Sequence, residues 1–123
     1  MSDDTMQQIY MRVTQRIQSD RKQLSQIEAQ TSGNQREVRL AALTKREIEG
    51  LDTSVPLYKS MGKMFVCETK AALLHDIETT TSEANAMIEA LEKKKKFVSR
   101  DLEEATGNLK DLVKSSQAAA AKN

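Results

Sequence analysis

Two long segments of the chain place apolar residues at steps of three and four, and a short strand-like segment separates them at the midpoint. Such steps put side chains on one face of an α-helix, because the helix has about 3.6 residues per turn. Each segment is about 45 residues long, which corresponds to a helix of about 65 Å. The spacing therefore predicts two long amphipathic helices joined by a short connector.

The composition allows only a narrow core. Of the 123 residues, 38% are apolar, 30% are charged and 3% are aromatic, and this apolar content is low for a compact globule. Such a chain can bury a seam between two helices but not a broad core. The 19 basic and 18 acidic residues leave a net charge of +1, which provides no general attraction to nucleic acid or to an anionic membrane. We therefore expect neither as a partner.

The first helix is predicted over about residues 6–50. Thr5 and Gln8 fit a capping box at its start, and Gly50 fits a stop at its end. Polar Asp20 and Asn34 interrupt an otherwise apolar stripe. The apolar and small members of that stripe are Met6, Ile9, Val13, Ile17, Leu24, Ile27, Thr31, Val38, Ala41 and Ile48.

The second helix is predicted over about residues 70–114, with Thr69 as its N-cap. The rest of the chain, about residues 115–123, has no apolar stripe and is expected to be a disordered tail. The stripe of this helix is Leu73, Ile77, Thr80, Ala84, Met87, Leu91, Lys94, Val98, Leu102, Ala105, Leu109 and Leu112. Because the connector is short, the two helices are predicted to form one domain, an antiparallel coiled coil that brings Leu24 near Val98.

A β-hairpin is predicted over about residues 57–68, at the turning end of the coiled coil. Glycine at the first turn position favours a type II′ turn over Gly62-Lys63, which sets Met61 opposite Met64. Both faces of this hairpin are apolar and both edges lack a partner strand, so it is predicted to pair with hairpins of other subunits. The residues assigned to this assembly are Leu57, Tyr58, Ser60, Met61, Gly62, Met64, Phe65, Val66 and Cys67.

The sequence offers no constellation for catalysis or for a metal. Cys67 is the only cysteine, which excludes an internal disulfide, and it is expected to be a buried, inert thiol. His75 is the only histidine and is expected on the surface. No phosphate-binding glycine motif and no membrane-spanning or secretory segment are present. We therefore expect a cytoplasmic protein that is not an enzyme and needs no cofactor or metal.

The central third of the chain resembles the β-type subunits of prefoldin. The resemblance is carried by LTKREIE at residues 43–49, VPLYKSMGKMFV at residues 55–66 and TKAALLHDIE at residues 69–78. The tyrosine, glycine and phenylalanine of YKSMGKMF match the central pattern of that family in order and spacing. The two helices match it in length and heptad character.

The resemblance implies a subunit of a heterohexameric, ATP-independent co-chaperone whose hairpins form a β-barrel platform. It implies coiled-coil arms whose tips capture unfolded actin and tubulin and deliver them to the cytosolic group II chaperonin. At the matching tip positions, it implies a client-binding surface formed by Met6, Ile9, Tyr10, Met11, Val13, Leu109, Leu112 and Val113.

Two other interpretations remain open at this stage. The chain could be a coiled-coil structural adaptor in another multi-subunit assembly, with its arms permanently occupied by a folded partner. Of the tip residues, Met6, Ile9, Val13 and Leu109 could equally serve only to close the seam, whereas Tyr10 and Met11 lie off the stripe and are expected to be exposed. The lysines at 93–96 suggest a nuclear-localisation or nucleic-acid signal, but a helix distributes four consecutive side chains around its circumference, which favours a solvated surface.

Overall fold

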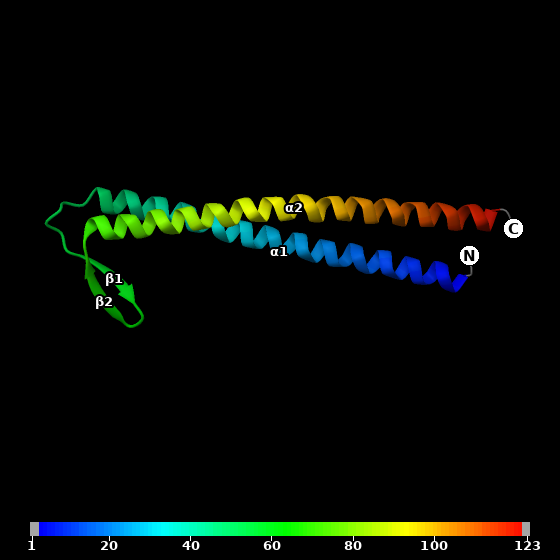
Figure 1. The fold of residues 1–123 in the computed structure, drawn as a ribbon, viewed down its shortest axis with the longest axis horizontal. Helices are drawn as coiled ribbons and strands as arrows, with labels where there is room; N and C mark the ends of the chain where they lie inside the picture. Colours follow the sequence, from blue (N-terminus) through cyan, green and yellow to red (C-terminus); the bar gives the residue numbers. More distant parts are fainter. Residues whose placement is uncertain (1–2, 122–123) are drawn as a thin grey trace. The chain divides into compact units, whose positions relative to one another are not determined.

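The structure is a computed structural model that describes residues 3–121. Its elements are α1 (Asp3–Glu49), β1 (Leu57–Met61), β2 (Met64–Glu68) and α2 (Lys70–Ala121). Two long helices thus pack together with a central antiparallel hairpin, as the sequence predicted (Figure 1). Among the described helices, none combines the length and the apolar content that a membrane crossing requires.

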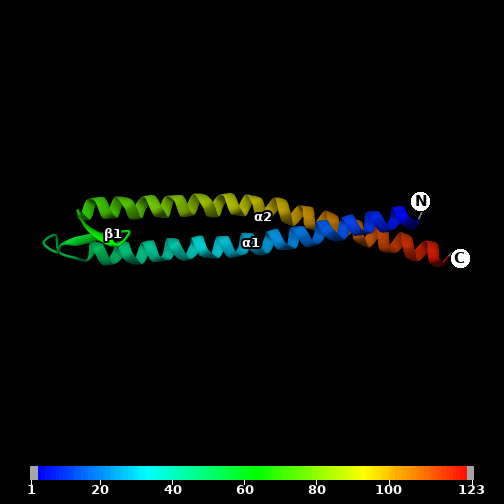
Figure 2. The same cartoon turned by 90° about the horizontal axis from the view of Figure 1, so that it is seen from below.

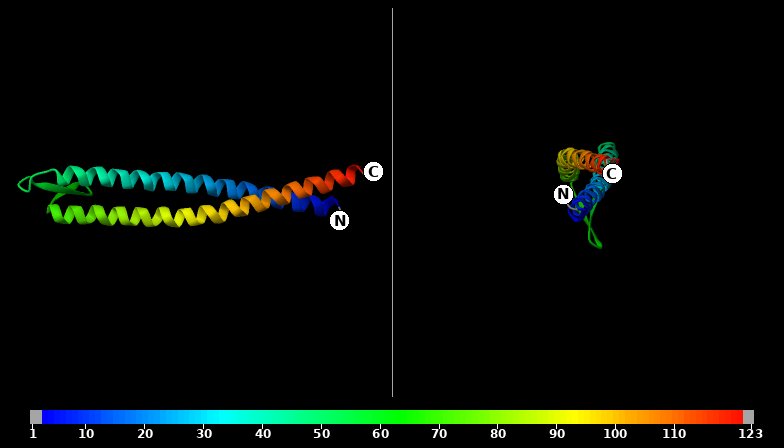
Figure 3. Two further views of the ribbon diagram at one scale, coloured as in Figure 1. Left: turned by 90° about the horizontal axis from the view of Figure 1, so that it is seen from above. Right: turned by 90° about the vertical axis from the view of Figure 1, so that its right-hand side faces the viewer.

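The chain divides into two compact units. The terminal unit comprises Met1–Ala29 and Leu91–Asn123, and the hairpin unit comprises Gln30–Ala90. Figure 3 shows the two helical segments of the terminal unit, coloured blue and orange to red, running in opposite directions. In Figure 2 the hairpin lies at the end of the hairpin unit where α1 stops and α2 starts. The expectation of a single domain stays a prediction.

The terminal unit has a small apolar core between its two helices. Ile27 is 1% exposed and packs with Leu91 and Val98, and Leu24 lies against this cluster. Ile17 and Ala105 are also buried. The predicted proximity of Leu24 and Val98 is confirmed, and with it the antiparallel register of this unit.

The hairpin unit buries smaller side chains. Ala41 and Ala84 are its buried apolar residues among those described. The prediction that Met87 belongs to the seam is wrong, because this side chain is 52% exposed while Ile88 is half-buried. A step of four from Ala84 turns about 40° around the helix and a step of three turns about 60°, so Ile88 lies nearer the seam. Lys94, in the terminal unit, is likewise exposed and not a seam residue.

Both helices extend beyond the predicted limits at the chain ends. α1 begins at Asp3 among the described residues, so Thr5 lies within its first turn and not at the predicted start. Asp3 and Asp4 occupy that turn, where negative charge is favourable. α2 continues to Ala121 instead of ending near residue 114, because the final residues include a run of alanine, the strongest helix former. The rest of the predicted tail, residues 122–123, lies outside the described residues.

The start of α2 and the hairpin follow the sequence closely. Thr69 Oγ1 accepts a hydrogen bond from the backbone N–H of Ala72 at 3.1 Å, as an N-cap should. The hairpin register places Met61 opposite Met64. Gly62 has a φ of 63°, and no described residue other than glycine has a positive φ. Positive φ at the first turn position alone is the type II′ pattern, which confirms the predicted turn.

Candidate functional site

The terminal unit carries an open hollow between the first turns of α1 and the last turns of α2. We name this hollow the terminal groove. It is lined by Met6, Gln7, Tyr10, Met11, Leu112, Val113, Ser116 and Gln117. The groove brings together residues more than one hundred positions apart because the two helices run antiparallel, and its lining carries no acidic or basic side chain.

Five of the eight predicted tip residues line the terminal groove. The other three, Ile9, Val13 and Leu109, are half-buried and do not line it. Sequence reasoning missed Gln7, Ser116 and Gln117, which are polar and give no hydrophobic signal. Helical spacing could have found Ser116 and Gln117, because they lie three and four residues beyond Val113 on the same face.

The apolar residues of the groove differ in depth. Met6 and Leu112 are half-buried. Tyr10, Met11 and Val113 are 50%, 60% and 42% exposed. Methionine side chains are flexible and polarizable, so such a surface adapts to apolar groups of different shape. The groove is therefore suited to binding apolar segments and not to acid–base chemistry, and the described residues contain no acidic, histidine or cysteine cluster for a metal.

The hairpin is anchored on one side by a salt bridge that sequence reasoning missed. Lys59 Nζ of β1 lies 2.8 Å from Asp76 Oδ2 of α2. The hydrogen bond with Asp76 raises the pKa of Lys59, and the same bond lowers the pKa of Asp76. Leu57 and Lys59 are half-buried on this face. The contact fixes the side of the hairpin that faces the helices and leaves the other side free.

The free side of the hairpin is strongly apolar. On this side Tyr58 and Phe65 are 60% and 73% exposed. Met64, near the turn on the face that also carries Lys59, is 70% exposed. Cys67 is also exposed, so the expectation of a buried thiol is wrong for the single chain, because no described element covers this face. In the described residues the sheet has two strands, which leaves each strand with one edge open to another strand.

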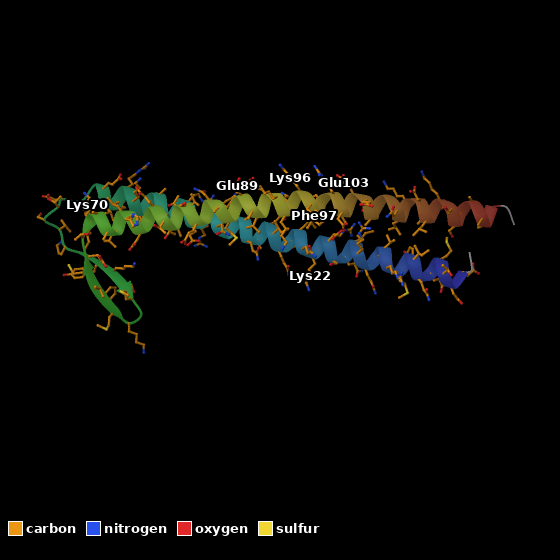
Figure 4. All side chains as sticks on the ribbon, viewed as in Figure 1. Lys22, Lys70, Glu89, Lys96, Phe97 and Glu103 are labelled. Atoms are coloured by element: carbon orange, nitrogen blue, oxygen red, sulfur yellow. The ribbon has the colours of Figure 1, made fainter. Side chains whose placement is uncertain are left out.

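The lysine run of α2 forms no compact basic patch. Lys93 through Lys96 are all exposed, and Figure 4 shows Lys96 and the following Phe97 on different sides of the helix. Phe97 is 74% exposed, and single exposed apolar residues of this kind are ordinary on protein surfaces. His75 is exposed, as predicted. The lysine run therefore supports the interpretation as a solvated helix surface.

A two-helix chain with a hairpin at the turning end defines a class of coiled-coil assembly subunit. Residues 11–116 match the family described as "Prefoldin subunit", and the chain belongs to that family. The predicted resemblance to prefoldin β-type subunits is thereby confirmed.

Relatives support this assignment over most of the chain, and a solved structure has a similar fold. The chain is 29% identical to "Probable prefoldin subunit 1" of Caenorhabditis briggsae, over 94% of this chain and 98% of the relative. It is also 29% identical to "Prefoldin subunit 1" of Saccharomyces cerevisiae, over 89% of this chain and 99% of the relative. The fold is similar to the crystal structure of the prefoldin beta subunit from Thermococcus strain KS-1, with a TM-score of 0.74, 24% identity and coverage of 83% and 90% of the two chains.

Proposed function

We propose that the chain is one subunit of a cytoplasmic, heterohexameric prefoldin co-chaperone that captures unfolded proteins without ATP. The terminal groove is the observation that carries this proposal. It offers exposed methionine, tyrosine and valine side chains to a client, and unfolded chains differ from folded ones in exposing apolar segments. Unfolded actin and tubulin are the proposed clients, and the cytosolic group II chaperonin is the proposed acceptor.

The hairpin is the proposed assembly element. Burying exposed Tyr58, Met64 and Phe65 against neighbouring hairpins removes apolar surface from water, at about 25 cal/mol per Å². Pairing of the open strand edges satisfies backbone groups that only water can otherwise satisfy. Both contributions require other prefoldin subunits, which are the proposed partners. No contribution from a cofactor, nucleic acid or membrane is needed for this function.

The test compares groove variants with a matched exposed aromatic outside the groove. The reconstituted complex is mixed with denatured actin, and aggregation is followed by light scattering. We expect Tyr10→Ser together with Met11→Ser to weaken suppression of aggregation, because both exposed apolar side chains are removed from the groove. Phe97→Ser removes an even more exposed aromatic elsewhere in the same unit and should leave suppression unchanged.

Two outcomes would contradict the proposed capture site. Equal loss of suppression in the groove variant and in Phe97→Ser would show that general surface hydrophobicity matters and the groove does not. Absence of suppression by the unmodified complex would favour the alternative of a structural adaptor, whose groove is occupied by a folded partner. Co-purification of the chain with five related subunits tests the assembly role separately, because a stable lone chain in cells would contradict it.

A further inference from the structure

A charged cluster crosses the helix interface of the terminal unit. Arg16 of α1 donates from Nε to Asp101 Oδ2 of α2 at 3.0 Å, and its terminal nitrogen donates to the other oxygen of the same carboxylate. Glu104 Oε2 lies 3.6 Å from the Arg16 guanidinium. The Arg16 guanidinium therefore already interacts with two carboxylates of α2.

A third carboxyl group of this cluster is buried in the seam. Asp20 lies one turn along α1 from Arg16, is 7% exposed, and keeps its Oδ2 without a hydrogen-bond partner in the described part of the chain. Coiled coils normally place an apolar residue at such a position. The side chain of Asp20 interacts with that of Asp101, and two carboxyl groups can share a hydrogen bond only when one of them carries a proton.

The charges around this pair favour one proton on Asp20. The hydrogen bond with Asp101, then burial, raises the pKa of Asp20 above its ordinary value. The Arg16 hydrogen bonds lower the pKa of Asp101 to about 2. The charged groups that face Asp20 are thus Arg16 on its own helix and Asp101 across the interface, with Glu104 drawing on the same guanidinium. When Asp20 is ionised, three carboxylates share one cation in a partly buried seam.

We propose that Asp20 and Asp101 form a proton-dependent latch that holds the helix ends of the terminal unit together and controls the width of the terminal groove. Asp20 is nine residues from Met11 on α1, about 13 Å along the helix. Loss of the shared proton leaves a buried charge that competes with Asp101 and Glu104 for the Arg16 guanidinium, which favours separation of the helices on the groove side of the cluster. The idea that this latch regulates client binding rests on the proposed function. The proposed opening and closing of the helix ends does not.

The sign of the pH dependence follows from the two carboxyl groups. Because folding raises the pKa of Asp20, its contribution favours the closed unit at low pH and is lost as pH rises through the raised value. Because folding lowers the pKa of Asp101, its contribution is lost only as pH falls from about 4 towards about 2. Closure is therefore strongest in mild acid and weakens towards neutral pH.

The test measures the separation of the helix ends in the full chain. Gln8→Cys and Ser115→Cys, both at exposed positions that do not line the groove, carry spin labels in a Cys67→Ser background, and pulsed electron resonance gives their distance. We expect the distance distribution to shift to longer values as pH rises from about 4 to about 8, across and above the ordinary aspartate pKa. In Asp20→Asn, whose amide donates to Asp101 without a charge, this shift should disappear.

A control variant and the contrary results complete this test of the latch. Glu28→Gln removes an exposed carboxylate of α1 and should keep the full pH-dependent shift. An unmodified chain whose distance does not change with pH, or an Asp20→Asn variant that follows the unmodified chain, would overturn the latch. Carbon NMR of the Asp20 carboxyl group provides a second readout, and titration at the ordinary aspartate value would also overturn it. If the distance follows pH but actin aggregation is not suppressed, the latch stands and the proposed function fails.

Discussion

Replacing Ile27 by alanine should destabilise the terminal unit far more than any exposed apolar replacement. The Ile27 side chain is 1% exposed and packs against Leu91, Val98 and Leu24. The change removes three carbon atoms, each worth about 0.8 kcal/mol of transfer free energy, and leaves a cavity in addition. Alanine recovers a few tenths of a kcal/mol through its higher helix propensity. The expected loss in the free energy of unfolding is therefore about 2–4 kcal/mol.

Thermal unfolding followed by far-ultraviolet circular dichroism measures this loss. At several degrees of melting temperature per kcal/mol for a chain of this size, the Ile27→Ala transition should move down by about 10 °C or more. Phe97→Ala is the matched control, because it removes a larger side chain from the same unit at a position that is 74% exposed. Its effect should stay within about 0.5 kcal/mol. Equal destabilisation by the two replacements would refute the assignment of the core to the Ile27 cluster.

Two further replacements and one titration test the hairpin and the start of α2. Gly62→Val forces a β-branched residue into a φ of 63° and should weaken the hairpin by about 1–2 kcal/mol, seen as reduced incorporation into the reconstituted complex, whereas Lys63→Val should not. Thr69→Ala removes the cap on Ala72 and should lower stability by about 1 kcal/mol in thermal unfolding, with Thr69→Ser as the control that keeps the bond. The lowered pKa of Asp76 beside Lys59 predicts that their contact adds stability above the ordinary aspartate value and loses it as pH falls through the lowered one; an unshifted Asp76 titration in carbon NMR would contradict the contact.

The sequence predicted the elements that depend on local patterns. The predicted seam of α1 is confirmed, including the buried position of Asp20. A spacing near 3.6 residues over many turns places these side chains on one face of the helix, and that face is the one available for burial. The hairpin register is confirmed because Gly62 selects the turn and the turn fixes the pairing. Met87 was assigned wrongly because steps of three and four fit a heptad equally well at that point, and only packing distinguishes Met87 from Ile88.

The candidate site was only partly predictable for a different reason. Apolar residues of the terminal groove could be found from the stripe and the resemblance, but the polar lining residues Gln7, Ser116 and Gln117 give no hydrophobic signal, and only their helical spacing from apolar groove residues could point to them. The Lys59–Asp76 salt bridge joins residues from two elements, and spacing along one element does not reveal it. Cys67 is exposed, whereas its burial was predicted from its position in a strand on an uncharged face, and that pattern does not show whether another element covers the face.

The buried residues of the terminal unit suggest how its two helices can stay paired at the Ile27 cluster and still separate at their ends. Ile27, Leu91 and Val98 provide non-directional apolar packing that does not depend on pH. Nearer the groove the interface passes through Asp20 and Asp101, whose attraction depends on one proton and one guanidinium. Local opening requires less free energy where few apolar contacts must be broken. Ile17 and Ala105 are buried on the groove side of this pair, so separation of the helices should begin beyond them, at the groove, while the Ile27 cluster keeps the register for closure.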